Sequence, residues 1–384
     1  MNKIALFIAH YTIGNSPSII NFIDLLSEHY SVHVFLRFVA LKNSAVLRKT
    51  NVRVVDLDNI PLNMFLEKLK KEPLSYKHYI SFDPHGFVLC KLLFPDSRPF
   101  YYSLELYIKD DHFGLYYTKE IMEKERVDIH NIAGLIIQSQ EKDALFRKDY
   151  NLQPSIPSLL LPITYKGPSV SGKSNSYVRN KYSIGSDKKI ALHVGGIAAW
   201  YAAIELAIAF SRIPSWVLFF HGYGFDGKYL SELKQTLHER NIKNVILSDE
   251  TFENLEDVDK IITSCDLGVA WYNDISIGFR VAGQSSGKMA YYMKYGLPII
   301  TKRYPSTILA IEDTGSGVCI DNFDEIPNAL SKIENNYSKY SQNACAEYDK
   351  TYRFENYVRL IMDFIEYAGT SRLIVETNAQ GCNA

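Results

Sequence analysis

The residues best suited to chemistry lie in the stretch Gln284–Ile300, which reads QSSGKMAYYMKYGLPII. A loop with Ser285 and Ser286 leads into an expected helix, and Lys288 falls in the first turn of that helix. Free backbone N–H groups and the positive end of a helix dipole favour a phosphate at such a place. The two hydroxyls can donate hydrogen bonds, and the lysine adds a full charge. The pattern indicates a phosphate-binding helix start; a serine cap with a solvent-facing lysine is the alternative.

A second group of polar side chains follows two expected strands in the N-terminal half. Asp83 and His85 come directly after the strand Tyr79–Phe82, and Glu105 follows the strand Phe100–Leu104. Carboxyl ends of neighbouring parallel strands meet at one edge of a sheet, where ligands bind. A carboxylate or imidazole there can take a proton from an acceptor hydroxyl or bind a sugar. These three residues are the candidate catalytic groups, with a structural turn as the alternative for His85.

Four glycines lie in turns after expected strands, where a ligand can approach the backbone. They are Gly14, Gly195, Gly196 and Gly222. The glycine turns allow close approach of the backbone to a phosphate. A tight strand-to-helix turn is the alternative for Gly195 and Gly196.

Strands and helices alternate along the chain, which is typical of parallel sheets covered by helices. The alternation stops at a Ser-, Gly- and Asn-rich segment between Gly167 and Lys189 and then restarts, so this segment indicates a linker. We expect an α/β protein with two Rossmann-like, doubly wound domains that face a central cleft. The predicted division is 1–165, a linker at 166–189, a second domain at 190–345, and a C-terminal part at 346–384. In that last part a helix over Tyr352–Tyr367 is expected to pack back on the first domain.

The composition limits the class of protein. The chain has 384 residues, and 42 basic side chains stand against 43 acidic ones, giving a formal net charge of −1. Nucleic-acid-binding proteins usually carry an excess of basic residues, and this chain has none, so we expect no nucleic-acid partner. Five scattered cysteines argue against a disulfide framework and against a zinc site, and no apolar run has the length of a membrane span. We therefore expect a cytoplasmic protein, and contact with the inner face of a membrane stays compatible with this.

The segment SSGKMAYYMKYGLP resembles a helix of the GT-B retaining glycosyltransferases, the glycosyltransferase family 4 relatives of glycogen synthase and mannosyltransferases. Their second domain carries the pattern S-P-x-K-x-x-E-Y-x-x-x-G-x-P, and the serine, lysine, second tyrosine, glycine and proline match. The resemblance implies that Ser285, Ser286 and Lys288 face a donor diphosphate. It also places the base near Thr251 and Phe252 and puts His221 and Gly222 close to the nucleotide. The loop of Gly14 would lie near the donor phosphate or the acceptor.

The chain departs from the pattern of this family at the positions that bind the donor ribose and the donor diphosphate. Tyr291 stands where the family has a ribose-binding glutamate, and Gly283 stands where a second glutamate is expected upstream. After Gly195-Gly196 the family's diphosphate-binding arginine is replaced by Ile197, and Arg280 is a candidate substitute.

The resemblance implies transfer of a sugar from a nucleoside-diphosphate donor, with UDP-sugar favoured, to a glycan or glycolipid hydroxyl in polysaccharide or glycoconjugate synthesis. It further implies retention of configuration without a metal or other cofactor. Two alternatives stay open: a sugar-nucleotide epimerase of the same architecture, and a non-catalytic GT-B binding subunit. The oligomeric state does not follow from the sequence.

Overall fold

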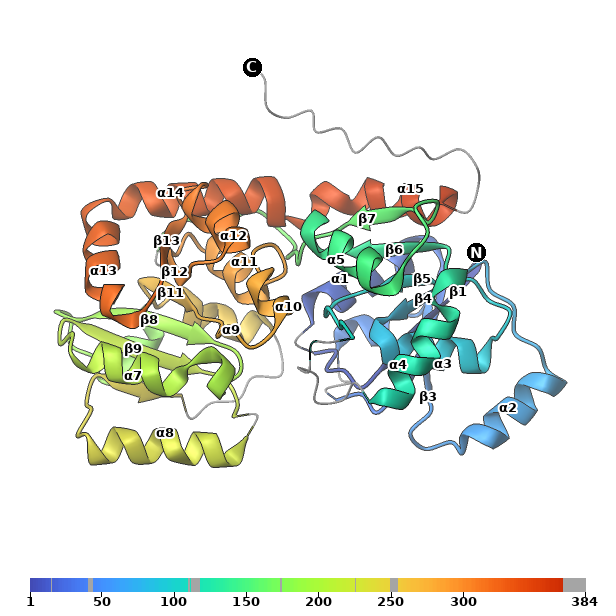
Figure 1. The fold of residues 1–384 in the computed structure, drawn as a ribbon, viewed down its shortest axis with the longest axis horizontal. Helices are drawn as coiled ribbons and strands as arrows, with labels where there is room; N and C mark the ends of the chain where they lie inside the picture. Colours follow the sequence, from blue (N-terminus) through green and yellow to red (C-terminus); the bar gives the residue numbers. More distant parts are fainter. Residues whose placement is uncertain are drawn as a thin grey trace, which may run out of the picture.

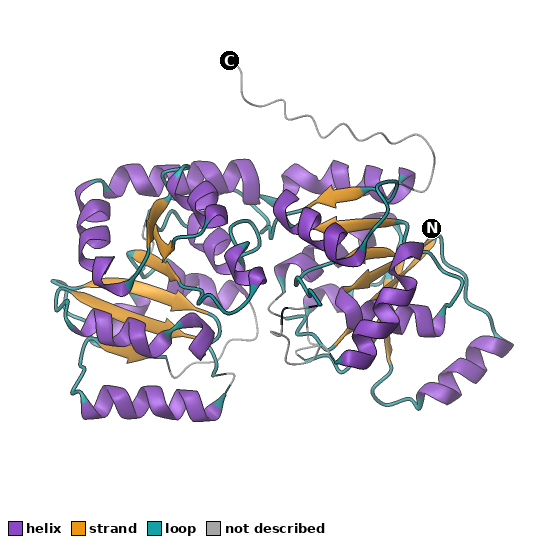
Figure 2. Cartoon of the chain, viewed as in Figure 1, coloured by secondary structure: helices purple, strands orange, loops and turns teal. Residues whose placement is uncertain are grey.

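The computed structural model describes residues 1–14, 16–40, 44–109, 111, 118–172, 175–224, 226–248 and 255–368. The chain forms two parallel sheets side by side, each with helices on its faces (Figure 1). Figure 2 shows the same alternation of strand and helix in both halves. The expected doubly wound, two-sheet architecture is confirmed.

The first sheet has seven parallel strands in the order β3-β2-β1-β4-β5-β6-β7. Their bounds are Lys3–Ala9 (β1), Ser31–Arg37 (β2), Val52–Asp56 (β3), His78–Phe82 (β4), Phe100–Tyr102 (β5), Gly134–Ile137 (β6) and Ser158–Leu160 (β7). The helices between them are Pro17–His29 (α1), Leu62–Lys71 (α2), Asp83–Leu93 (α3), Lys119–Asp128 (α4) and Gln140–Tyr150 (α5). Strand β7 was not expected, because it has only three residues and prolines lie close on both sides of it.

The second sheet has six parallel strands in the order β10-β9-β8-β11-β12-β13. Their bounds are Lys189–Val194 (β8), Trp216–His221 (β9), Val245–Leu247 (β10), Leu267–Ala270 (β11), Ile299–Lys302 (β12) and Gly317–Ile320 (β13). The helices are Tyr177–Lys181 (α6), Ala203–Ser211 (α7), Gly227–Glu239 (α8), Leu255–Ile262 (α9), Ile277–Arg280 (α10), Gly287–Lys294 (α11), Pro305–Thr307 (α12), Ile326–Asn335 (α13) and Tyr337–Glu347 (α14).

One expected helix is divided in two. The sequence favours a continuous helix over Ala198–Phe210, but a separate 3₁₀ turn covers Ala199–Tyr201 before α7 begins at Ala203. The break occurs at Ala202, whose φ of 51° lies in the left-handed region. Trp200 and Tyr201 therefore stand on a turn of their own.

The C-terminal helix α15 (Val358–Tyr367) crosses back to the first sheet, as the sequence predicts (Figure 1). Its apolar face belongs to the same core as strands β1, β2, β4 and β5. The ring of Phe364 lies 5.5 Å from the ring of Phe100. A Cβ at Gly134 would lie 2.6 Å from the Phe364 ring, so this glycine gives the helix room to approach the sheet. The helix begins later than expected, because the preceding residues form short turns.

Candidate functional site

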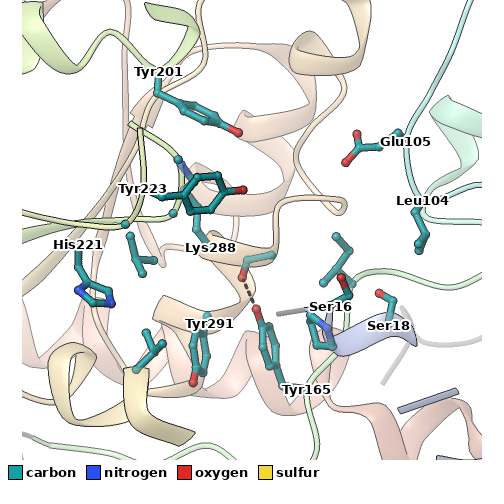
Figure 3. A pocket seen from close by; sticks show the side chains of 18 of the residues that line it. Ser16, Ser18, Leu104, Glu105, Tyr165, Tyr201, His221, Tyr223, Lys288 and Tyr291 are labelled. Atoms are coloured by element: carbon teal, nitrogen blue, oxygen red, sulfur yellow. Dashed lines mark hydrogen bonds between the residues drawn. The ribbon is translucent and has the colours of Figure 1, made fainter. Parts of the chain in front are cut away.

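A cavity of about 350 Å³ lies between the two domains and is lined by residues of both. Seven of the sequence-predicted site residues line it: Glu105, Gly195, Gly196, His221, Gly222, Lys288 and Tyr291. Figure 3 shows Glu105 on one side of this cavity and Lys288, with Tyr201 and Tyr223, on the other. The structure therefore brings together residues that lie almost two hundred positions apart in the sequence.

Two glycine turns form the wall on the side of the second domain. They follow β8 and β9, and the N–H of Gly195 donates to the carbonyl of His221 at 2.9 Å. A Cβ at Gly222 would lie only 1.7 Å from the carbonyl oxygen of Gly195, so the two turns pack backbone to backbone. Gly195 has a φ of 107°, a conformation that favours glycine. Both positions require glycine for reasons of packing or backbone angle, and both leave backbone open toward the cavity.

Helix α11 begins at the cavity. Ser286 caps it, since its hydroxyl accepts from the N–H of Met289 at 3.2 Å, and it also bonds with the hydroxyl of Tyr272. Ser285 and Ser286 do not line the cavity, whereas Gly287 and Lys288 do. The start of α11 thus has a serine cap, as the purely structural interpretation expects, and also a lysine that faces the cavity, as the phosphate-binding interpretation expects.

Lys288 has a buried ammonium with no hydrogen-bond partner among the residues that the structure describes. It lies 3.9 Å from the centre of the Tyr201 ring and 5.4 Å from that of Tyr272. Ring faces attract a cation, but they compensate only part of its lost hydration. Burial accordingly lowers the pKa of Lys288 to about 7. An anion in the cavity would supply the missing partner.

A second helix start borders the cavity from the first domain. Ser16, Pro17 and Ser18, at the beginning of α1, line it. The positive ends of α1 and α11 therefore both border this space, which favours a negatively charged ligand. Gly14 itself is buried in the loop just before and is not part of the lining.

Glu105 reaches the cavity, and Asp83 holds the backbone beneath it. The buried Oδ1 of Asp83 accepts from the N–H groups of Leu104 at 2.7 Å and of Glu105 at 3.1 Å. Desolvation raises the pKa of both carboxyl groups, and the charge of Glu105 raises that of Asp83 further. The buried Lys142 opposes both shifts. Asp83 is placed to position Glu105 and does not line the cavity.

Left-handed backbone marks the same edge of the first sheet. His10, Phe38 and Asp83 directly follow the adjacent strands β1, β2 and β4, and their φ angles are 54°, 53° and 54°. Non-glycine residues in this region concentrate at functional sites. The ring of His85 lies 4.6 Å from that of His10, so His85 belongs to this edge, although it does not line the cavity.

Tyr291 is held by protein contacts on two sides. Its hydroxyl donates to the carboxylate of Asp259 on α9, and its ring stacks on that of Tyr165 with centroids 4.5 Å apart and an angle of 6°. Burial and the neighbouring Asp259 raise its pKa. No pattern in the sequence indicates Asp259 or Tyr165, because their contacts with Tyr291 join segments distant along the chain.

Arg280, another sequence-predicted residue, does not line the cavity. It is exposed and forms an ion pair with Asp274. Thr251 and Phe252 lie outside the described residues. The lining includes aromatic residues that the sequence reasoning missed: Tyr11, Tyr201 and Tyr223. Tyr11 and Tyr223 each come two residues after the end of a strand, β1 and β9, so their position after a strand was the available signal.

Over the described ranges, no group of three or more His, Cys, Asp or Glu side chains comes together as a metal site. Within those same ranges, no helix has the length and apolar character needed to cross a bilayer.

Comparison with known proteins agrees with this geometry. Residues 235–361, about a third of the chain, match the family described as glucosyltransferase 3-like, C-terminal domain. No curated protein sequence matches the chain.

Similar solved structures span both domains. HepE of Anabaena in complex with UDP-glucose superposes with a TM-score of 0.71 at 14% identity, covering 95% of this chain and 100% of that one. Sucrose-phosphate synthase of Thermosynechococcus elongatus gives 0.71 at 14% identity, covering 95% and 98%. A glycosyltransferase of Rickettsia africae gives 0.66 at 11% identity, covering 96% and 99%. The expected GT-B fold is confirmed, and the structural similarity covers nearly the whole chain.

Proposed function

We propose that this protein is a glycosyltransferase that moves a sugar from a nucleoside-diphosphate donor to an acceptor hydroxyl. The observation that carries the proposal is the buried, unpartnered ammonium of Lys288 among the described residues, at the start of α11 and opposite Glu105. Support comes from the glucosyltransferase 3-like match and from HepE, whose structure contains UDP-glucose. A UDP-sugar is accordingly the favoured donor, and a glycan or glycolipid the favoured acceptor.

In this mechanism the leaving diphosphate collects the developing negative charge. Lys288, the N–H groups at the start of α11 and the Gly195-Gly196 turn would stabilise that charge in a site already formed. We propose that the reaction retains the anomeric configuration, with the donor phosphate taking the acceptor proton on the same face, and that it needs no metal. Glu105, with its raised pKa, would bind a sugar hydroxyl across the cleft.

Calorimetric titration with UDP, GDP and CMP tests the binding step, with Lys288→Ala as the site variant. We expect one of these nucleotides to bind the wild type, and the variant to lose at least tenfold in affinity, as expected for a contact to a charged group. Absence of binding by all three to the wild type would overturn the proposal.

The cluster of Asp83, Glu105 and Lys142 is the observation that favours an epimerase as the second candidate, because it supplies acid and base groups in one place. Incubating the protein with a nucleotide sugar and no acceptor separates the two. An epimerised sugar nucleotide would support the epimerase, and transfer to an added acceptor supports the transferase. Binding with neither reaction would indicate a non-catalytic subunit.

A further inference from the structure

The turn between β8 and α7 carries two aromatic residues, Trp200 and Tyr201. Tyr201 lines the cavity and projects its hydroxyl toward the side of Glu105 (Figure 3). The same ring lies over the ammonium of Lys288, 3.9 Å from ring centre to Nζ. The phenol therefore stands between the cation of the second domain and the carboxylate of the first.

This turn is fixed on both sides by hydrogen bonds. The N–H of Asn273 donates to the carbonyl of Trp200, and the side-chain amide of Asn273 donates to the carbonyl of Ala199, each at 2.8 Å. The N–H of Ala202 closes the turn on Ala199 at 3.0 Å. A hydroxyl on such a turn is held in place before a ligand arrives, which reduces the cost of binding.

The phenol of Tyr201 can donate its proton in a hydrogen bond. Burial and the charge of Glu105 raise the pKa of Tyr201, so the hydroxyl stays protonated at neutral pH. A neutral O–H donor next to a lysine ammonium suits a phosphate oxygen.

We propose that the Tyr201 hydroxyl donates to the diphosphate of the nucleotide donor and is the second diphosphate ligand beside Lys288. This inference rests on the proposed function. The hydroxyl would supply a diphosphate ligand in a site that has no arginine for this role among the described residues that line it. The glycine turn is followed by the apolar Ile197, and Arg280 is paired with Asp274 and does not line the cavity. The donation strengthens as charge develops on the leaving group.

The test is a comparison of Tyr201→Phe with the wild type on uridine, UMP and UDP by calorimetry. The phenylalanine ring keeps the contact with Lys288 and removes only the hydroxyl. We expect unchanged affinity for uridine and a loss on the order of tenfold for UDP, the effect of one hydrogen bond to a charged group. Equal losses on all three ligands, or no loss with UDP, would overturn the assignment.

A further variant separates the role of the hydroxyl from a structural one. Tyr272→Phe is the matched control, since the Tyr272 ring also faces Lys288 but its hydroxyl bonds to Ser286. Any loss in this control should fall equally on the three ligands. If the wild type binds none of the ligands, the proposed function fails; if only Tyr201→Phe is without effect, this inference alone fails.

Discussion

The phenol of Tyr291 donates a hydrogen bond to the carboxylate of Asp259 on the neighbouring helix α9. Tyr291 stands where the resembled helix has a glutamate. A carboxylate from a different helix thus lies behind this wall of the cavity, and Tyr291, which lines the cavity, is bonded to it. The stacked ring of Tyr165 fixes the arrangement from the other side.

Tyr291→Glu, which introduces the glutamate of the resembled helix, is therefore expected to damage the site. The new carboxylate would face Asp259 in a buried place and would leave Tyr165 without its stacking partner. We expect the melting temperature to fall by roughly 3 °C or more, measured by scanning calorimetry. Asp259→Asn in the same chain should recover part of this loss, because it removes the repulsion. A higher melting temperature for Tyr291→Glu, together with tighter UDP binding, would contradict this view.

The pH dependence of nucleotide binding should report the unusual lysine. With a pKa of about 7 in the empty site, Lys288 is largely neutral at pH 8–9, whereas a bound diphosphate favours its charged form. Binding above pH 7 must then take up a proton, and affinity should fall by up to about tenfold per pH unit. Titrations in two buffers of different ionisation enthalpy measure the uptake. The same pH slope in Lys288→Met would assign the effect to another group.

Lys288 should lower the free energy of unfolding of the protein without a bound nucleotide. Its folded pKa lies below the value of about 10.4 usual for an exposed lysine, so the unfolded chain binds more protons between these two values. The free energy of unfolding should therefore rise with pH between about 7 and 10 through this group. Lys288→Met lacks the penalty and is expected to melt higher than the wild type at pH 7, with the difference shrinking toward pH 10. The measurement is thermal unfolding without nucleotide; a variant that melts lower at pH 7 would show that the lysine has a stabilising partner.

Asp83 should also change stability with pH, but in the opposite direction to Lys288, because its side chain is an acid. Its folded pKa is raised, so the unfolded chain ionises more readily, and this group lowers stability as pH rises above about 4. Asp83→Asn keeps the oxygen that accepts from Leu104 and Glu105, and asparagine tolerates the left-handed backbone. We expect this variant to melt above the wild type at neutral pH and level with it near pH 4. Asp83→Ala, which loses the acceptor, should melt lower at both pH values.

Short-range patterns predict most of this fold and only part of its site. Strands such as β10 and helices such as α11 follow from apolar runs and turn residues that act locally. Lys288 and Glu105 could be selected because each stands at the end of an element that faces the cleft. The break at Ala202 could not, because an alanine-rich run favours a helix and the turn is held by Asn273 from a distant loop. The bond between Tyr291 and Asp259 is likewise tertiary, so no spacing in the sequence contains it.

The close contact of the two glycine turns gives the last prediction. A methyl group at Gly222 would meet the carbonyl of Gly195 at 1.7 Å, a distance that backbone atoms cannot tolerate, so Gly222→Ala must force the ends of β8 and β9 apart. Because both turns line the cavity, we expect loss of measurable UDP binding and a lower melting temperature. Gly227→Ala is the matched control, since nothing lies within 4 Å of its Cβ position at the start of α8. There alanine favours the helix and should leave binding unchanged. Wild-type affinity in Gly222→Ala would show that the ligand does not depend on this wall, and that the donor diphosphate lies elsewhere in the cleft.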